Sequence, residues 1–380
     1  MAKRFFLAII LGLGAFCGVV EAAKATVKPR EIGAKAYILM EAGTQRVLLK
    51  HHENKQVSPA SITKLMTAYV VYQAIANGEI ATTDKIAVGR NARYKAIGSR
   101  MFLELGSEVS IDQLLHGLVI QSGNDAAIAL AEAVSGTEED FVELMNAAAK
   151  QLGMKNSHFK NVTGLTEEGH YMSAKDIAIL SRAIITEFPK DYQLYKQRSF
   201  TWNKIKQDNR NGLLQLDPSV DGLKTGHTEA AGYCLASSAK RGKMRLISVV
   251  LGTQSPRARE QASKKLLDYG FAHYAIKLLY QAGKKAASVA IEDGVDETLD
   301  ISVLKDVALP VRKTGKPEIE AFLQVDKTIE APVTRGQQVG TIDFQLSGQL
   351  YYQVPVVAMK SVAEIGFFAG LWRSITSIFD

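Results

Sequence analysis

Between about Ser58 and Pro189, hydrophobic residues recur mostly at the spacing of helices. The first helix follows Ser58, which we expect to be its N-cap, with Pro59 at the first helical position. Ala, Leu, Met and Tyr fill this stretch, and Asn77-Gly78 ends it. Ser110 and Gln113 form a capping box for a helix at 110–121. Further helices are expected at 125–134, at 140–152 and from Ser173, as the cap, towards Glu187.

Strand patterns flank this helical region on both sides. Two apolar-rich stretches, 34–41 and 46–52, are joined by a turn and predict a hairpin. Strands return at 221–225, 232–239 and 244–253, and a helix is expected from 258 to about 272. Strands from both ends of one region predict an α/β domain, with a mostly antiparallel sheet flanked by helices and an inserted helical lobe.

After about Gly283 the pattern changes to short alternating segments separated by Gly, Pro and Asp. These segments predict a small all-β C-terminal domain at 284–359. The preceding α/β domain would then occupy 26–283. Residues 360–380 predict a terminal amphipathic helix, since large apolar side chains recur there at intervals of three and four. We expect this helix to be an interfacial membrane anchor, and a core helix is the alternative.

The N-terminus has the composition of a secretory signal peptide. Lys3-Arg4 precede an apolar run that ends at Val20, and small residues follow it. We expect a signal peptide at 1–25, with cleavage after Ala22 or Ala25, and an uncleaved membrane anchor as the alternative. Cleavage would leave Cys234 as the only cysteine, so the mature chain could form no internal disulfide.

The overall charge changes the picture little. The chain has 46 Lys and Arg against 39 Asp and Glu, and its formal net charge is +7. The basic residues are interleaved with acidic ones and form no dense block, which argues against a nucleic-acid partner. No metal or other cofactor is implied, because the histidines show no ligand spacing.

Chemistry enters with Ser61 and Lys64, an S-x-x-K pair at the start of the first helix. Residues three apart share a helix face, and an N–H group in the first turn is free to donate to an oxyanion. A serine beside an amine and a spare N–H is the minimum arrangement for acyl transfer. The same spacing also occurs at Ser157, Ser237 and Ser302, but none of these starts a helix.

Two further motifs follow. Ser122-Gly123-Asn124 lies between two predicted helices, where a hydroxyl can relay a proton and an amide can orient a substrate. The alternative is a turn in which Asn124 only caps the next helix. Lys224-Thr225-Gly226 ends a predicted strand, where a glycine lets a substrate backbone approach closely. Lys313-Thr314-Gly315 repeats this motif but is predicted to be a solvated turn.

In this order and context, the motifs resemble those of the penicilloyl-serine transferases. More closely, the segments 58–61, 121–126, 209–214 and 220–228 resemble the D-alanyl-D-alanine carboxypeptidases among the low-molecular-mass penicillin-binding proteins. The resemblance covers nearly everything after the signal peptide, including the β-rich domain and the C-terminal anchor. It implies a penicillin-binding protein/β-lactamase-like fold and a periplasmic enzyme on the outer face of the bacterial cytoplasmic membrane.

The resemblance also implies roles for the reacting groups. Ser61 would attack the carbonyl between the terminal D-alanines of a peptidoglycan stem peptide, after neutral Lys64 has taken its proton. Ser122 would pass that proton to the leaving amine, and Lys224 would polarise the network. Asn124 would hold the substrate amide. β-Lactams would acylate the same serine.

Four further residues are carried over from the family as substrate-binding. The N–H groups of Ser61 and His227 would hold the oxyanion. Thr225 and Arg259 would bind the terminal carboxylate, for which a guanidinium is well suited. Without the resemblance, Arg259 is as well explained as a surface arginine on a helix as by carboxylate binding. Arg210 matches a family residue near the site.

Two alternatives stay open at this point. A class A-like β-lactamase would use the same serine, but it needs a glutamate followed by leucine and asparagine, which Glu167-Glu168-Gly169-His170 lacks. Those enzymes also carry Asp at the position of Gly123. A catalytically silent wall-binding protein is the other alternative, and the intact serines and lysines argue against it.

Overall fold

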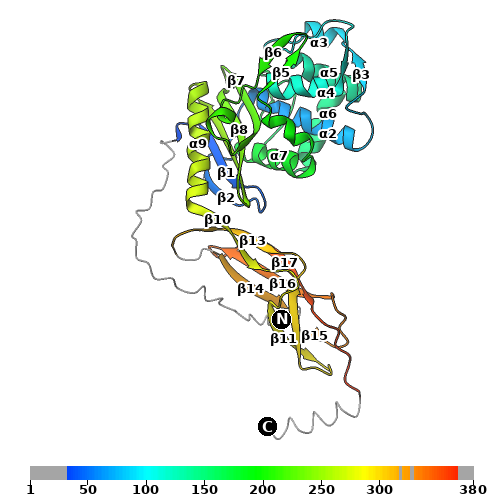
Figure 1. Ribbon diagram of the computed structural model, residues 1–380, viewed down its shortest axis with the longest axis vertical. Coiled ribbons are helices and arrows are strands. Elements are labelled where there is room, and N and C mark those ends of the chain that lie inside the picture. Colours follow the sequence, from blue (N-terminus) through cyan, green and yellow to red (C-terminus); the bar gives the residue numbers. More distant parts are fainter. Residues whose placement is uncertain (1–31, 316–318, 326–328, 367–380) are drawn as a thin grey trace. The chain divides into compact units, whose positions relative to one another are not determined.

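The computed structural model describes residues 32–315, 319–325 and 329–366 of the chain (Figure 1). The described residues form two compact units that divide between Ala272 and His273. The predicted signal peptide, residues 1–25, lies outside the described residues.

The first unit is built on a five-stranded antiparallel sheet. Its strand order is β2 (Val47–His51), β1 (Ala36–Glu41), β9 (Met244–Thr253), β8 (Gly232–Arg241) and β7 (Val220–Thr228). Strands from the two ends of the unit meet where β1 pairs with β9. The predicted hairpin, the three later strands and the α/β class are confirmed.

Different helices pack against the two faces of this sheet (Figure 1). Alternate residues such as Ile38 and Met40 belong to the main core together with residues of the helices. On the other face lies α9 (Pro256–His273), whose Gly270 packs against Leu39 and Leu246. This alternation follows from the two-residue period of a strand.

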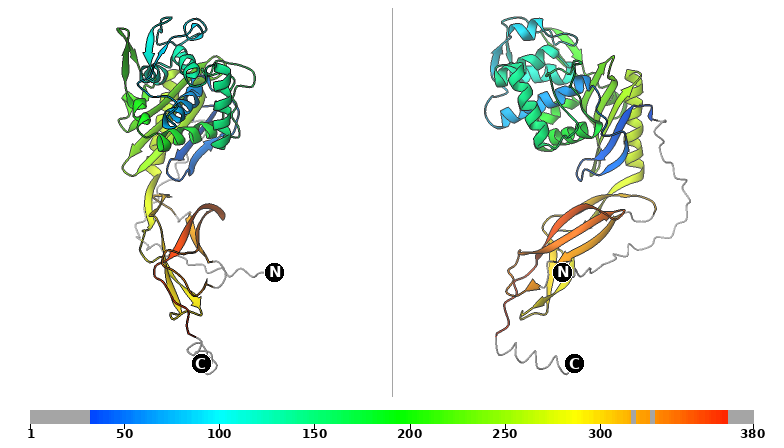
Figure 2. Two further views of the ribbon diagram at one scale, coloured as in Figure 1. Left: turned by 90° about the vertical axis from the view of Figure 1, so that its right-hand side faces the viewer. Right: turned by 180° about the vertical axis from the view of Figure 1, so that it is seen from behind.

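Several helices lie between β2 and β7 in the sequence, and they surround one buried helix, α2 (Lys64–Ala76). Ten of its thirteen residues are buried, and Figure 2 shows it, in blue, among the other helices. A helix that is apolar on all sides is stable only when enclosed. The remaining helices are α3 (Arg90–Tyr94), α4 (Ile111–His116), α5 (Asn124–Ser135), α6 (Glu138–Gln151), α7 (Ala174–Glu187) and the short α8 (Leu213–Leu216).

Helix starts were predicted with mixed success. Ser110 forms the expected capping box with Gln113, and Ser173 caps α7. The expectation for Ser58 and Pro59 was wrong. A 3₁₀ turn, η1 (Ala60–Thr63), comes first, no side chain caps it, and α2 begins only at Lys64.

Four short strands form two small antiparallel pairs that were not predicted. They are β3 (Lys85–Ala87) with β4 (Glu108–Ser110), and β5 (Ser199–Trp202) with β6 (Ile205–Asp208). A π-helical turn, η2 (Gly117–Gln121), continues α4, and a 3₁₀ helix, η3 (Asp191–Lys196), precedes β5.

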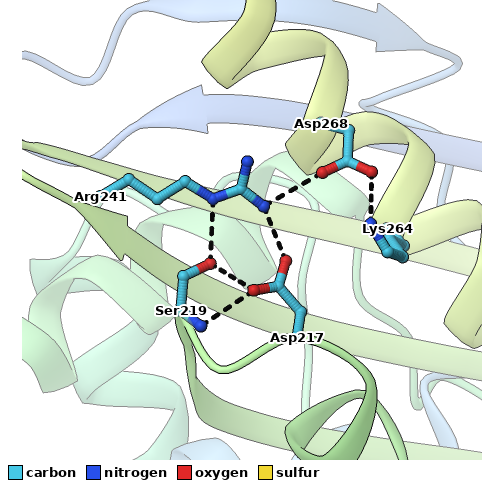
Figure 3. A network of polar contacts seen from close by, with 5 residues as sticks. All are labelled: Asp217, Ser219, Arg241, Lys264 and Asp268. Atoms are coloured by element: carbon cyan, nitrogen blue, oxygen red, sulfur yellow. Dashed lines mark hydrogen bonds and ion pairs between the residues drawn. The ribbon is translucent and has the colours of Figure 1, made fainter.

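A network of charged residues ties α9 to the sheet (Figure 3). Arg241, at the end of β8, contacts Asp217 at 2.7 Å and Asp268 of α9 at 3.0 Å. Lys264 of α9 reaches the other oxygen of Asp268, and Ser219 bonds both Arg241 and Asp217. The network therefore fixes α9 against β8 and against the loop that leads into β7.

The second unit is a β domain, as predicted. One sheet has the order β14 (Ile319–Val325), β16 (Gln338–Leu346), β17 (Gln349–Ala358), β12 (Thr298–Val303), β11 (Ala287–Glu292), β15 (Ile329–Glu330). A separate pair joins β10 (Tyr274–Tyr280) to β13 (Val307–Arg312). Because β10 pairs within this unit, the boundary lies at His273 and not at the predicted residue 283.

The predicted C-terminal helix needs a second correction. Val362 is one of the apolar residues of the predicted helix, but it is 1% exposed, forms a bridge with Val333 and packs in the core of the β domain. Residues 360–366 are therefore not helical. The rest of the predicted anchor, 367–380, lies outside the described residues. No helix within the described ranges has the length and apolar character needed to cross a membrane.

Candidate active site

Ser61 and Lys64 form the first pair of the site. The Nζ atom of Lys64 lies 3.0 Å from the Oγ atom of Ser61 and 2.7 Å from the carbonyl oxygen of Thr163. Ser61 lies in the 3₁₀ turn and Lys64 is the first residue of α2, so the pair survives the shift in the helix start. The serine hydroxyl is thus within reach of an amine held in place by a backbone acceptor.

The environment of Lys64 favours the neutral amine. Its side chain is buried, and burial is the largest cause that lowers its pKa to about 7. The charge of Arg210 lowers this pKa further, and Asp125 acts in the opposite direction. A lysine whose pKa lies close to neutral pH can act as a general base.

Ser122 and Lys224 form a second pair from distant parts of the chain. The Lys224 Nζ atom donates to the Ser122 Oγ atom at 2.8 Å and to the Thr225 carbonyl at 3.2 Å. Burial, followed by the charges of Lys64 and Arg210, holds the pKa of Lys224 well below its ordinary range. Ser122 itself adopts a left-handed conformation at φ 65°, which is uncommon outside glycine and typical of functional turns.

The two pairs belong to one site. The η1 turn packs against β7, and a Cβ atom on Gly226 would lie only 2.9 Å from the Pro59 carbonyl and 3.1 Å from Ile62. The charge of Lys64 also lowers the pKa of Lys224, as expected if the two amines are neighbours. The structure therefore brings together the four residues on which the sequence argument depends.

Asn124 forms one edge of the site. Its Nδ2 atom donates to the carbonyl of Ile97 and its backbone N–H to that of Ser99, while its buried Oδ1 atom has no hydrogen-bond partner among the described residues. A cavity of about 230 Å³ beside the site borders Ile97 and Thr163, but neither Asn124 nor a residue of the two serine–lysine pairs lines it. The unpaired Oδ1 atom is suited to accept an amide N–H.

The K-T-G strand carries the remaining predicted residues. His227 is exposed and stacks on Tyr233, its partner on β8, with ring centroids 3.9 Å apart. Arg259 of α9 is 7% exposed, so it is not the surface arginine of the alternative interpretation. Its guanidinium donates to the carbonyls of Gly226 and Arg210, at 3.5 and 3.3 Å.

The other S-x-x-K serines lie in ordinary structural contacts. Ser157 donates to Asp176, Ser237 shares a hydrogen bond with Ser248 between β8 and β9, and Ser302 donates to Lys284 in the β domain. The carboxylate of Glu167, the residue weighed for a β-lactamase, accepts from Asn161.

Two parts of the site were not predicted from the sequence. The first is the Thr163 carbonyl that receives Lys64. The second is Asp125, whose carboxylate accepts the backbone N–H groups of residues 101–103 and so fixes the loop beside Asn124. An acid directly after the S-x-N motif was a visible signal for the second, but a backbone carbonyl has no sequence signature.

A serine beside a buried lysine of lowered pKa, with a second serine–lysine pair and an amide oxygen without a described partner near it, defines an active-serine acyl-transfer enzyme of the penicillin-binding kind. Comparison with family models gives the family. Residues 22–255 match D-alanyl-D-alanine carboxypeptidase, and residues 274–364 match the C-terminal domain of penicillin-binding protein 5. The chain belongs to this family and is a penicillin-binding, serine-type D-Ala-D-Ala carboxypeptidase.

Individual relatives agree over nearly the whole length. The D-alanyl-D-alanine carboxypeptidase DacA of Haemophilus influenzae is 39% identical over 97% of this chain and 95% of its own, and DacC of Escherichia coli is 41% identical over 94% and 91%. The crystal structure of penicillin binding protein 5 from Haemophilus influenzae superposes with a TM-score of 0.80 at 39% identity, covering 89% of this chain and 100% of that one.

A relative with a bound β-lactam is also similar to part of this chain. The ampicillin-bound form of penicillin-binding protein D2 from Listeria monocytogenes is 30% identical, with a TM-score of 0.56 over 63% of this chain and 97% of that one.

Proposed function

We propose that this enzyme removes the terminal D-alanine from peptidoglycan stem pentapeptides through an acyl-enzyme on Ser61. The observation that carries the proposal is the pair of buried lysines, each within hydrogen-bond distance of its own serine. Neutral Lys64 takes the proton of Ser61 as the hydroxyl attacks the carbonyl between the two terminal residues. The proton then reaches the leaving amine through Ser122, and Lys224 keeps this hydroxyl polarised.

The substrate is held from both sides in this proposal. Asn124 accepts an amide N–H of the acyl part on its unpaired Oδ1 atom, and this part extends towards the cavity bordered by Ile97 and Thr163. Thr225 and Arg259 hold the terminal carboxylate, and Arg210 adds positive charge. The expected role of Gly226 in admitting the substrate backbone is not supported, because the space beside its Cα atom is filled by Pro59 and Ile62.

The oxyanion lies between the backbone N–H groups of Ser61 and His227 in this mechanism. Water then attacks the acyl carbonyl, the bond to the Ser61 Oγ atom breaks, and the proton returns to that oxygen. The shortened peptide leaves with a new carboxylate. β-Lactams enter as carbonyl compounds that acylate Ser61 by the same first step.

The test is release of free D-alanine from a stem pentapeptide, with fluorescent penicillin labelling in parallel. Ser61→Ala is expected to abolish both release and labelling. The matched control is Ser157→Ala, which should retain both. Ser157 is also the serine of an S-x-x-K spacing, but it lies outside the site and donates to Asp176. Label that survives Ser61→Ala contradicts the proposal, and so does a pentapeptide that is not cleaved by unlabelled wild type whose Ser61 takes up the label in the parallel assay.

We also propose that the chain is exported and attached to the periplasmic face of the cytoplasmic membrane through residues 367–380. The charged and apolar N-terminal pattern and the spacing of Phe368, Trp372, Ile375 and Phe379 support this location. Because Val362 belongs to the β-domain core, the deletion that tests the anchor should begin after Gly366. Unchanged membrane association of that variant contradicts the proposal.

A further inference from the structure

The loop at 158–172 contacts the nucleophile turn through more than the Thr163 carbonyl. On the helix side, Lys64 donates to Thr163 and the hydroxyl of Thr67 donates to the Val162 carbonyl at 2.7 Å. At its far end the loop pairs with the chain that leads into η1, where Val57 and Met172 exchange two backbone hydrogen bonds. Between these anchors, residues 165–169 are exposed.

His170 gives the loop a further contact with the η1 turn, between these two anchors. Its Nε2 atom lies 2.9 Å from the Oγ1 atom of Thr63, the residue directly before Lys64. The backbone N–H of Lys160 donates to the Nδ1 atom at 3.3 Å, so Nδ1 carries no proton and Nε2–H is the donor to Thr63. Both side chains are buried, at 5% exposure for His170 and 0% for Thr63.

The packing leaves the loop little freedom beside the turn. A Cβ atom on Gly164 would lie 1.9 Å from the Ala60 carbonyl and 2.8 Å from the Thr63 hydroxyl. The loop backbone therefore rests directly on the turn that carries Ser61. If the loop moved away, the Thr163 carbonyl would leave Lys64 and water would reach the amine.

We propose that His170 is a positioning residue for acylation, which holds the loop on Thr63 so that the Thr163 carbonyl stays against Lys64 and keeps its amine dry. This inference rests on the proposed role of Lys64 as the base. It goes further by assigning a function to a histidine that touches neither substrate nor Ser61.

The histidine itself does not titrate in the working range. Burial lowers the pKa of His170 to about 4, against the charge of Glu167, and His158 lowers it further. The ring of Phe159 packs edge-on against it at 5.8 Å. His170 is thus neutral between pH 5 and 9, and a changed pH profile in its variants would report on Lys64.

The test measures the second-order rate constant of acylation by a fluorescent penicillin between pH 5 and 9.5. His170→Phe keeps the size of the ring and removes both hydrogen bonds. We expect a loss of about tenfold or more at pH 7 and a shift of the acidic limb by about one pH unit upward, because Lys64 becomes hydrated. His170→Gln can accept from Lys160 and donate to Thr63 with its one amide, so it should stay within about threefold of wild type.

Two further variants keep the result decisive. Thr63→Val removes the acceptor alone and should reproduce both effects, and adding it to His170→Phe should cause no further loss. The matched control is His158→Phe, because His158 lies on the same loop and its ring forms a hydrogen bond with the Gly169 carbonyl but with no described residue of the η1 turn. It should behave as wild type.

Several results would overturn the proposal. One is a wild-type pH profile in both Thr63→Val and His170→Phe, even if their rates or melting temperatures fall, since a merely structural role would give that outcome. Another is full additivity in the double variant. If Lys64 is not the base, the result is distinguishable, because the pH profile of the wild type itself would then lack an acidic limb near pH 7.

Discussion

The rate of Ser61 acylation is expected to follow the neutral fraction of Lys64. Burial, followed by the charge of Arg210, lowers the pKa of this lysine to about 7. The amine is then about half neutral at pH 7, about 9% neutral at pH 6 and about 1% at pH 5. The second-order rate constant should therefore fall about tenfold per pH unit below 7 and level off above about pH 8.

The neighbouring charges predict the sign of a second change. Because the charge of Arg210 lowers the pKa of Lys64, Arg210→Gln should move the acidic limb to higher pH. Lys64→Arg keeps the positive charge but cannot supply a neutral amine, so acylation should fall by about 10³-fold or more at every pH.

The assay is stopped-flow labelling with a fluorescent penicillin at constant ionic strength, from pH 5 to 9.5. Ser157→Ala serves as the control for changes unrelated to the site. A rate constant that stays flat between pH 5 and 9 refutes the reasoning, as does a midpoint near the ordinary lysine value of 10.5. A limb that moves to lower pH in Arg210→Gln would show that the electrostatic argument has the wrong sign.

Three other predictions concern stability and loop packing. Protonation of Lys64 opposes folding, because its folded-state pKa lies below the ordinary value of 10.5, so the penalty grows as pH falls from 10.5 and is nearly complete below about 7. Urea titrations would measure the free energy of unfolding of Lys64→Met minus that of wild type at each pH. This difference should be about 2.5 kcal/mol larger at pH 6 than at pH 9, and an equal difference at both pH values contradicts the prediction. Gly164→Ala should slow acylation at least about tenfold, since its backbone has φ 82° and the new methyl group would meet the Ala60 carbonyl; a wild-type labelling rate contradicts it. Asp217→Asn should lower the free energy of unfolding by about 1–2 kcal/mol, because it weakens the contact with Arg241, and leave D-alanine release unchanged; a loss of release at wild-type stability would show that the network reaches the site.

The parts of the fold that follow from local pattern were predicted well. The hairpin of β1 and β2 and the helices α5 to α7 lie within a few residues of their expected bounds. The strand β10 and the hairpin of β5 and β6 show why other strands were missed. In β10, Tyr274 follows α9 with no glycine or proline between, so the helix and the strand merge in the sequence. The hairpin of β5 and β6 turns at Asn203-Lys204, both with positive φ, and the asparagine there was a signal that went unused.

The site divides in a similar way. The contact of Lys64 with Ser61 follows from a spacing of three residues and survives even though the helix starts later than expected. The contact of Lys224 with Ser122 spans 102 residues and could be expected only from the family resemblance. The partners that tune Lys64, a backbone carbonyl at Thr163 and a histidine set aside as a metal ligand, depend on tertiary packing alone.

Reactivity and stability conflict at this site for physical reasons. Two amines are buried where their charged forms are disfavoured, Ala60 and Ser122 adopt left-handed conformations, and Asn124 keeps a buried oxygen unpaired within the described part of the chain. Each such feature costs about 1–3 kcal/mol or more and persists only where the surroundings enforce it. The enclosed helix α2 and the paired strand β7 supply that rigidity. Apolar replacements of the two lysines should therefore favour folding while they remove the chemistry, because the burial that destabilises a lysine charge is also what makes its amine a base near neutral pH.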